Sequence, residues 1–457
     1  MIAIQSLRLH FQTVARSPAA WGLAVAAVMA AGWSAYTRLP HANLVGVSLL
    51  GLAAFGLLFC KPVLGAALAA FMITGDIASY VPGSFSPLLL LVVIIFLLRR
   101  LVQREWALTF LPLTKWALLL FAWHLLSAAW AASYDYFTLS GLYRNVLVLL
   151  VFTWCIQKPR DYLYVLLAAG AGMLLTSVLS VKSILDFLAA GLRAPEMGLL
   201  HRTDTSRFYG QWHDPNILSQ TIVPFVALGF ALVRTRLPVM IRVFASTTVL
   251  AGITAVLLSL SRAGILCLIV ILGVIVAADR RRWLIISCVG ALLALVVTVF
   301  PVNVLGRMGT LAQGRGDASI NQRTELMVAG IRMFERSFPL GVGLGNFRTY
   351  SMDYVPELVW SAIPHNTYTE ILSEIGLIGL IFFLGALLSV AVPLLKVKRI
   401  MDPGDFGKNL GICMQAVFLG MLVSYMFLSM STYAPYWMVL ALIAVYPKVF
   451  AEPAPTA

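Results

Sequence analysis

Three polar stretches of the chain carry residue types that can act on a phosphorylated substrate. They are RFYGQWHDPNILSQ at 207–220, SLSRAGIL at 259–266 and PHNTYTEI at 364–371. Each one borders or interrupts a long apolar run, where a charged side chain is costly unless it is paired or hydrated. A guanidinium binds phosphate through two parallel hydrogen bonds, and a neutral imidazole can accept a proton. The residue types therefore indicate an anion-binding site with a candidate general base.

His365 is the candidate general base. The segment from Thr367 to Glu370 fits a capping box, in which the two side chains satisfy each other's backbone amides at a helix start. In that interpretation Pro364 and Asn366 only direct the chain into the helix, but His365 has no part in the cap. Beside the positive end of a helix the imidazole is biased toward its neutral form, which is the form a base needs.

Arg262 stands inside an apolar run with no acid next to it in the sequence. One interpretation makes it a turn residue between two helices, with Ser261 capping the second helix and Gly264 allowing close packing. The alternative is that Arg262 binds an anionic ligand, because a charge near the bilayer boundary costs on the order of 2.5 kcal/mol without a partner.

The first stretch allows two interpretations in the same way. Arg207 either binds substrate or pairs with Asp204 three residues earlier. His213 is either an interfacial histidine before the helix start at Asp214-Pro215 or a substrate contact. Asn216 is a helix-start residue that can also face substrate.

The composition identifies the elements that must position these residues. The chain has 457 residues, of which 60% are hydrophobic and 11% charged, whereas soluble domains have roughly 25% charged residues. Long apolar runs predict an all-α polytopic membrane protein with about 12, and up to 14, transmembrane helices. No cleavable signal peptide is expected. The expected spans are 18–37, 43–59, 62–80, 85–98, 112–131, 137–156, 161–190, 215–233, 239–258, 262–278, 283–300, 366–392, 408–430 and 434–449.

The net charge of +14 is explained by the membrane topology and does not indicate a nucleic-acid partner. Lysine and arginine cluster at alternate span ends, as at Arg99–Arg100 and Arg280–Arg282, which is the positive-inside pattern. Both termini are then expected on the cytoplasmic side. Segments 191–214 and 301–365 fall on the opposite side and contain arginine but no lysine.

This topology divides the chain into six expected regions. They are N-terminal transmembrane helices 1–190, a short outer segment 191–214, central transmembrane helices 215–300, a large outer loop 301–365, C-terminal transmembrane helices 366–450 and a disordered tail 451–457. Arg323 and Arg348 in the large outer loop, and Asn366 directly after it, are further candidates for substrate binding. The five cysteines lie in or beside apolar runs, and the outer loops have no cluster of acids with metal-ligand spacing. We therefore expect neither a metal nor a cofactor.

Five motifs in order resemble the bacterial O-antigen ligase and polymerase superfamily, and most of all the O-antigen ligases. They are Arg-x-x-Gly-x-x-x-x-Pro-Asn at 207–216, Ser-Arg-Ala-Gly at 261–264, Asn-Gln-Arg-Thr-Glu at 321–325, Pro-Leu-Gly-Val-Gly-Leu-Gly-Asn-Phe at 339–347 and Pro-His-Asn-x-Tyr at 364–368. The motif region spans about 207–385. His213 departs from the pattern, because an uncharged residue is expected there.

The resemblance implies a metal-independent, inverting glycosyltransferase of the GT-C type in the bacterial inner membrane, with its active site facing the periplasm. The donor would be a glycan on undecaprenyl diphosphate, and the acceptor a sugar of the lipid A core. Carried over to this sequence, the catalytic residues are His365, Arg262 and Arg207. The other expected partners are membrane lipids.

Other functions remain open at this level. A polymerase that joins repeat units and a ligase that transfers glycan to protein differ from the first candidate only in the acceptor. A transporter of lipid-linked glycan is a different class, and it would use ionisable residues within the spans. His124, Arg144 and Asp76 are of that kind, as are Lys182 and Asp186, and the sequence assigns none of them a role.

Overall fold

The computed structural model describes residues 54–77, 85–105, 108, 110–133, 136–193, 214–299, 318–356, 358, 362–397 and 400–450. Within these ranges the regular structure consists of α-helices and a 3-10 turn, as expected for an all-α protein. Arg207 and His213 lie outside the described residues, as do the expected span at 18–37, the tail at 451–457 and most of segment 191–214.

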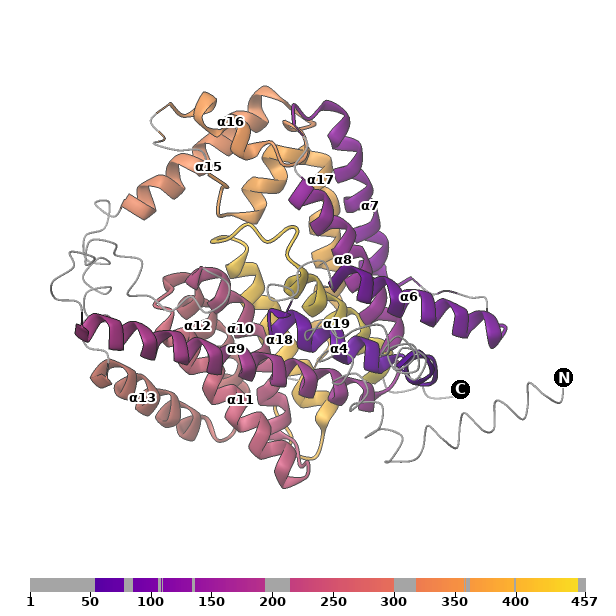
Figure 1. The fold of residues 1–457 in the computed structure, drawn as a ribbon, viewed down its shortest axis with the longest axis vertical. Coiled ribbons are helices and arrows are strands. Elements are labelled where there is room, and N and C mark those ends of the chain that lie inside the picture. Colours follow the sequence, from indigo (N-terminus) through magenta and orange to yellow (C-terminus); the bar gives the residue numbers. More distant parts are fainter. Residues whose placement is uncertain are drawn as a thin grey trace, which may run out of the picture.

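The N-terminal part of the fold contains α9, the long helix that crosses the molecule in Figure 1. Its elements are α4 (Val63–Thr74), α6 (Phe85–Val102), α7 (Pro112–Ser127), η2 (Ala128–Trp130), α8 (Tyr136–Cys155) and α9 (Pro159–Arg193). Helix α4 packs along α9. A Cβ atom at Gly172 would lie 2.4 Å from the Phe71 carbonyl oxygen, so the small residue allows the two backbones to approach.

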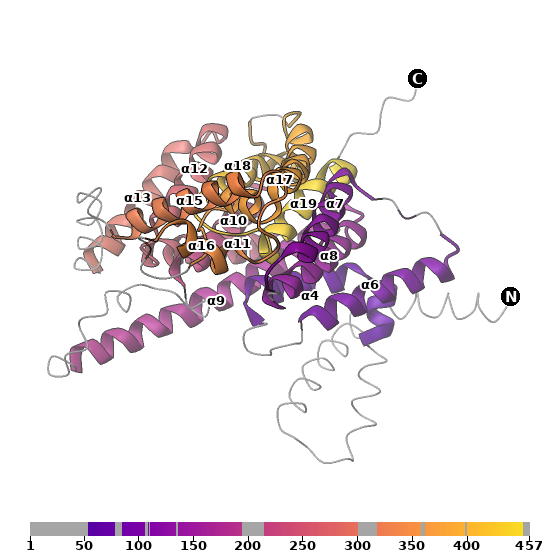
Figure 2. The same ribbon diagram turned by 90° about the horizontal axis from the view of Figure 1, so that it is seen from above.

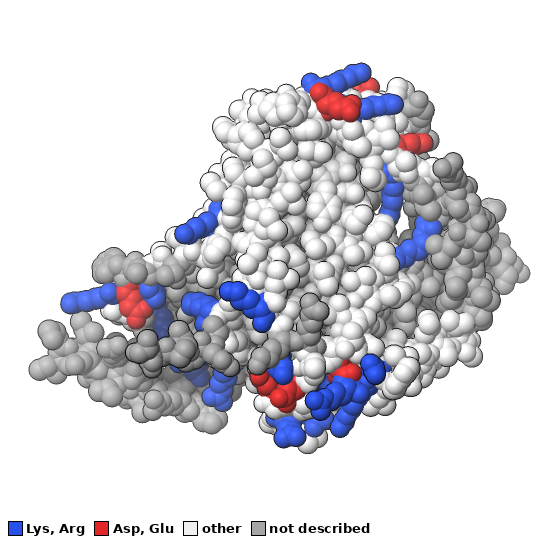
Figure 3. All heavy atoms as spheres, turned by 180° about the vertical axis from the view of Figure 1, so that it is seen from behind, with Lys and Arg blue, Asp and Glu red and all other residues white. Residues whose placement is uncertain are grey.

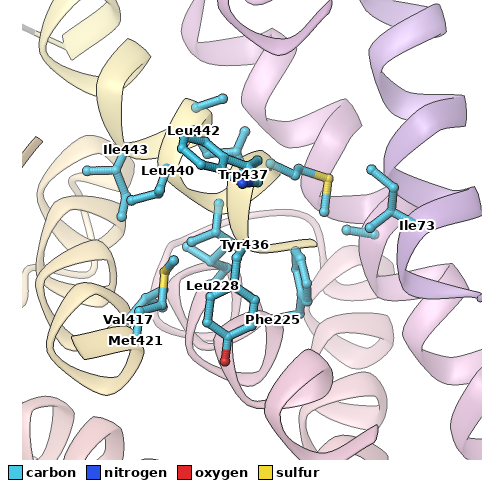
Figure 4. Close-up of a cluster of buried hydrophobic side chains, with 14 of the residues drawn as sticks. Ile73, Phe225, Leu228, Val417, Met421, Tyr436, Trp437, Leu440, Leu442 and Ile443 are labelled. Carbon is cyan, nitrogen blue, oxygen red and sulfur yellow. The ribbon is translucent and has the colours of Figure 1, made fainter. Parts of the chain in front are cut away.

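The central and C-terminal helices enclose the main buried core. They are α10 (Pro215–Arg234), α11 (Val239–Leu258), α12 (Arg262–Ala278), α13 (Arg282–Val299), α17 (Thr367–Leu394), α18 (Phe406–Ser424) and α19 (Ala434–Phe450). Helix α10 packs along α11 and α18, and α12 packs along α18. Figure 4 shows Phe225 of α10, Met421 of α18 and Trp437 of α19 meeting in this core.

An ion pair fixes α10 to α12 at one end of the bundle. The Arg234 guanidinium donates to both carboxylate oxygens of Asp279, and the Nη2–Oδ1 distance is 2.9 Å. Asp279 is 3% exposed, and a buried carboxylate of this kind needs its cation. The two helices are therefore held together at their C-terminal ends, opposite to the N-termini where the Ser-Arg motif lies.

Segment 301–365 contains two helices in its described part, α15 (Ala318–Arg336) and α16 (Phe347–Tyr354). They lie over the beginning of α17, as Figures 1 and 2 show. A small apolar cluster of their own holds them together, made by Leu326, Ala329, Met333, Phe347, Val355 and Leu358.

Seven described helices are long and apolar enough to cross a membrane, or eight if a bent pair is one span. The bent pair joins residues 54–60 to α4 at 111°, where the sequence predicts the separate spans 43–59 and 62–80. Shorter apolar helices at Arg262–Ala278, Arg282–Thr298 and Ala434–Phe450 fall on three further expected spans. In Figure 3 charged side chains gather at the top and bottom, and a broad uncharged field separates them. These features agree with a polytopic membrane protein, while the expected total of 12 to 14 spans stays a prediction.

Candidate functional site

The N-termini of α10 and α12 meet through a side-chain hydrogen bond. Ser261 caps α12, because its hydroxyl oxygen accepts from the Gly264 N–H at 3.2 Å, and the same hydroxyl donates to the Asn216 Oδ1 atom at 2.8 Å. A Cβ atom at Gly264 would lie 2.2 Å from the Ser219 hydroxyl, so only glycine permits this approach. The predicted cap at Ser261 and the packing role of Gly264 are confirmed. Arg262 is the first residue of α12 and is half-buried at this junction.

Asp214 caps α10, and Pro215 occupies the first helical position as the sequence predicts. The Asp214 Oδ1 atom accepts hydrogen bonds from the N–H groups of Asn216 at 2.6 Å and Ile217 at 3.3 Å. From the sequence alone, Asp214 is predicted only as part of a helix start. Its carboxylate also acts electrostatically on His365. This interaction could not be predicted from the spacing of the two residues in the sequence.

The cap of α17 differs from the expected capping box. Asn366 is the N-cap, and its side-chain oxygen accepts from the Thr369 N–H at 3.1 Å. Thr367, predicted as the cap, instead donates its hydroxyl to the Leu428 carbonyl oxygen at 2.7 Å and accepts from the Met430 N–H at 2.9 Å. The prediction was wrong because the threonine hydroxyl finds tertiary partners in the connection between α18 and α19. The side-chain oxygen of Asn366 is occupied by the cap, whereas its substrate-binding role stays a prediction.

His365 directly precedes this cap in a strained conformation. Its φ of 49° lies in the left-handed region, which non-glycine residues rarely adopt outside constrained sites. Its Nδ1 atom is buried and has no hydrogen-bond partner among the described residues. A buried ring nitrogen left open in this way is available for a ligand hydroxyl.

Burial lowers the pKa of His365 below its ordinary value, the positive charge of Arg323 lowers that pKa further, and the negative charge of Asp214 opposes them. The net effect favours neutral imidazole near neutral pH. The expected bias toward the neutral form is thus present, although burial rather than the helix end is its main cause.

Helix α15 brings Arg323 to this histidine. Gly330 packs so closely on α17 that a Cβ atom there would lie 2.3 Å from the Thr369 Cγ2 atom. Arg323 lies two turns before Gly330 and therefore on the same face of α15. His365 in turn directly precedes the N-cap of α17, four positions before Thr369 in the sequence. The crossing at Gly330 thus explains how residues 42 positions apart in sequence come together.

The other arginines of the loop helices have different surroundings. Arg332 donates to the Tyr354 carbonyl oxygen at 2.8 Å, and the Arg336 guanidinium lies 5.1 Å from the Tyr354 ring centroid. Arg348 is exposed at the start of α16, and no contact among the described residues joins it to His365. Of the loop arginines in the described part, Arg323 is the one that the structure brings to the histidine.

Tyr433, in the connection between α18 and α19, lies next to the site and was missed by the sequence analysis. Its hydroxyl is 3.0 Å from the Thr221 hydroxyl, two turns into α10 from Asp214. Burial raises the pKa of Tyr433 well above its ordinary value, and the charges of Asp76, Arg144 and Asp214 all act on it. No motif marks this tyrosine, because its neighbours come from the turn after α4, from α8 and from the start of α10.

The intramembrane polar residues noted in the sequence are partly accounted for. The His124 Nδ1 atom is 2.9 Å from the Leu120 carbonyl oxygen, one turn earlier in α7, so the ring is satisfied within its own helix. Arg144 and Asp76 share the surroundings of Tyr433. The side chains of Lys182 and Asp186 lie outside the described residues.

The assembled site has the chemistry of anion binding next to a base. The N-termini of α10, α12 and α17 contribute positive dipole ends, and Arg262 and Arg323 add full charges. Among the described residues, no group of three histidine, cysteine or acidic side chains is arranged to hold a metal ion. The described groups alone therefore offer fixed cations and one imidazole.

Residues 247–384 match the family model described as O-antigen ligase. This segment includes the Ser-Arg motif, the loop helices, His365 and the first part of α17, so the predicted resemblance to the O-antigen ligase superfamily is confirmed. The match supports glycan transfer of the ligase or polymerase type. No curated protein matches the chain.

Proposed function

We propose that this protein, whose residues 247–384 match the O-antigen ligase family model, transfers a glycan from undecaprenyl diphosphate to a sugar of the lipid A core at the periplasmic face of the inner membrane. The observation that carries the proposal is the open, buried Nδ1 atom of His365 beside Arg323 and Asp214. A base of low pKa next to fixed cations suits the attack of an acceptor hydroxyl on a carbon that carries a diphosphate leaving group.

In this mechanism His365 takes the proton from the acceptor hydroxyl. The freed oxygen attacks the anomeric carbon of the donor and forms the new glycosidic bond. The bond between that carbon and the diphosphate oxygen breaks at the same time, and its electron pair leaves with undecaprenyl diphosphate. Direct attack from the opposite side inverts the configuration at the anomeric carbon.

The remaining residues stabilise charge as it moves. Arg262 and Arg323 neutralise the leaving diphosphate, because a guanidinium fork matches two phosphate oxygens. Arg207, which lies outside the described residues, is proposed to join them, with Asn216, Asn366, His213 and Arg348 as further substrate contacts. Asp214 stabilises the imidazolium that forms when His365 takes up its proton. The catalytic step is proposed to need neither metal nor cofactor.

The proposed architecture is that of a GT-C type enzyme with both termini in the cytoplasm. The site is built from the beginnings of α10, α12 and α17 and from α15. A transporter would instead need its ionisable residues near the bilayer midplane. The position of His365 at the start of α17, outside the apolar run, therefore favours an enzyme.

The acceptor can be tested in a strain that lacks the gene. Loss of a ligase should leave lipid A core without attached polymer, together with accumulated polymer on the lipid carrier. Core capped by a single repeat unit would instead identify a polymerase, and an unchanged lipopolysaccharide with unglycosylated proteins would identify a protein glycan transferase. Wild-type protein should restore the normal pattern, and the His365→Ala variant, expressed at the same level, should not.

A further inference from the structure

Helix α17 is broken at Gly376, one helical turn below the residues that pack against α15. Gly376 has a φ of 70°, and a Cβ atom there would lie 2.0 Å from the Pro339 carbonyl oxygen. The N–H of Leu377 donates to that oxygen at 3.0 Å, and the carbonyl of Ile375 accepts from the Trp123 indole at 2.8 Å. The backbone groups freed by the break are thus satisfied from other parts of the chain.

The glycine-rich segment 339–347 docks onto the broken turn. The N–H of Val342 donates to the Ser373 carbonyl oxygen and the N–H of Gly343 to the Glu374 carbonyl oxygen, both at 2.8 Å. Gly341 and Gly343 have φ values of 78° and 95°, which only glycine adopts without strain. The alternating glycines of this segment therefore allow its backbone to approach α17.

The Glu374 side chain closes this contact. Its Oε2 atom accepts from the Gly345 N–H at 3.0 Å, and its Oε1 atom accepts from the Phe347 N–H at 3.1 Å. Glu374 is 9% exposed, so these are charge-assisted hydrogen bonds with little competition from water. A carboxylate offers acceptors on both oxygens, whereas an amide at the same place offers only one.

Phe347 links this carboxylate to α15. Its ring packs against Gly330, where a Cβ atom would lie 3.1 Å from the Phe347 Cε2 atom, and Gly330 is the point at which α15 crosses α17. A continuous path therefore runs from Glu374 through Phe347 to the crossing that sets Arg323 beside His365.

We propose that Glu374 is a positioning residue for the transfer reaction: by binding the N–H groups of Gly345 and Phe347, it holds α15 in register with the first turn of α17 and so keeps Arg323 beside His365. The proposal rests on the transfer function proposed above. It adds to that function a residue that acts through the docked segment.

The test compares the pH dependence of transfer in wild-type protein and the Glu374→Gln variant, as full-length chains with lipid-linked glycan donor and lipid A-core acceptor. Displacement of Arg323 removes a positive charge from the surroundings of His365, so the acidic limb of the rate profile should move to higher pH by up to about one unit. Misplacement of a group near the reacting atoms should also lower the maximal rate roughly ten- to a hundredfold.

Arg323→Gln and the double variant separate this role from loss of folding. If Glu374 acts through Arg323, the double variant should have the same acidic limb as Arg323→Gln alone. Glu335→Gln, on the exposed face of α15, is the matched control and should leave the limb in place. If Glu374→Gln is poorly folded, Glu374→Asp keeps the charge but shortens the reach, and should shift the limb in the same direction.

Hydrogen exchange supplies a readout that does not depend on turnover. The amides of Gly345 and Phe347 should exchange faster in the Glu374→Gln variant than in wild type. An acidic limb that stays at the wild-type pH, or shifts that add independently in the double variant, would overturn the role of Glu374 while leaving the transfer function intact. Absence of transfer by the wild-type protein would instead contradict the proposed function itself.

Discussion

The hydroxyl of Ser261 donates a hydrogen bond to the side-chain oxygen of Asn216 at 2.8 Å and so joins the first turn of α12 to the first turn of α10. With the Arg234–Asp279 pair at the other end, the two helices are connected at both ends of their contact. The N-terminal connection holds Arg262 in place, because Arg262 is the next residue after Ser261.

Replacement of Ser261 by alanine should therefore lower both stability and activity. Loss of the cap costs roughly 1 kcal/mol, and loss of the bond to Asn216 adds to this. Thermal unfolding in detergent should show a lower midpoint for Ser261→Ala than for Thr254→Ala, whose hydroxyl bonds only the Leu250 carbonyl of its own helix. Equal midpoints for the two variants would show that the connection contributes nothing.

Arg262 should not tolerate lysine. The lysine retains the positive charge but loses the two-point hydrogen bonding to phosphate oxygens. We expect Arg262→Lys to lose much of its transfer activity while its expression stays near that of wild type, as measured with purified protein and lipid-linked donor. The exchange Arg332→Lys, where the native guanidinium bonds the Tyr354 carbonyl oxygen in the loop, is the matched control. Full activity of Arg262→Lys would reduce Arg262 to a turn residue.

The charges beside His365 should shift the pH profile of transfer in opposite directions. Arg323 lowers the pKa of His365, so Arg323→Gln should raise that pKa and move the acidic limb to higher pH. Asp214 acts in the opposite direction, so Asp214→Asn should move the limb to lower pH. Asparagine caps a helix about as well as aspartate, so the second variant should keep α10 intact. Shifts of the same sign in both variants would contradict the assigned surroundings of His365.

The orientation in the membrane can be read from cysteine labelling in a Cys288→Ser background, which removes the exposed native thiol. A cysteine at Asp353 should react with an impermeant reagent added outside the inner membrane, because α16 is expected on the periplasmic side. A cysteine at Gly404, between α17 and α18, should react only after the membrane is opened. The reverse pattern would invert the topology and place the site in the cytoplasm.

Local sequence signals predicted the starts of the helices that form the site. Asp214-Pro215 and Ser261 mark the first residues of α10 and α12, and the expected span 366–392 agrees closely with α17. The caps at Asp214 and Ser261 could be predicted because each side chain bonds N–H groups two or three residues further along the chain.

Features that depend on tertiary contacts could not be predicted in the same way. The sequence predicts Thr367 as a helix cap, but its hydroxyl forms hydrogen bonds with residues that lie 61 and 63 positions further along the chain. Gly376 lies in a continuous apolar run, and the break there exists because segment 339–347 supplies the missing partner. The surroundings of His365 likewise arise from the crossing of α15 and α17 at Gly330, which no spacing in the sequence encodes.

The central claim, that His365 is the base in glycan transfer, is tested most directly by single-turnover transfer with the His365→Ala variant. General-base catalysis contributes roughly 100-fold to 10,000-fold, so the rate should fall by that factor. Binding of the lipid-linked donor should stay near the wild-type level, because the imidazole acts on the acceptor hydroxyl. A rate within a few-fold of wild type, measured on protein that binds donor normally, would contradict the account.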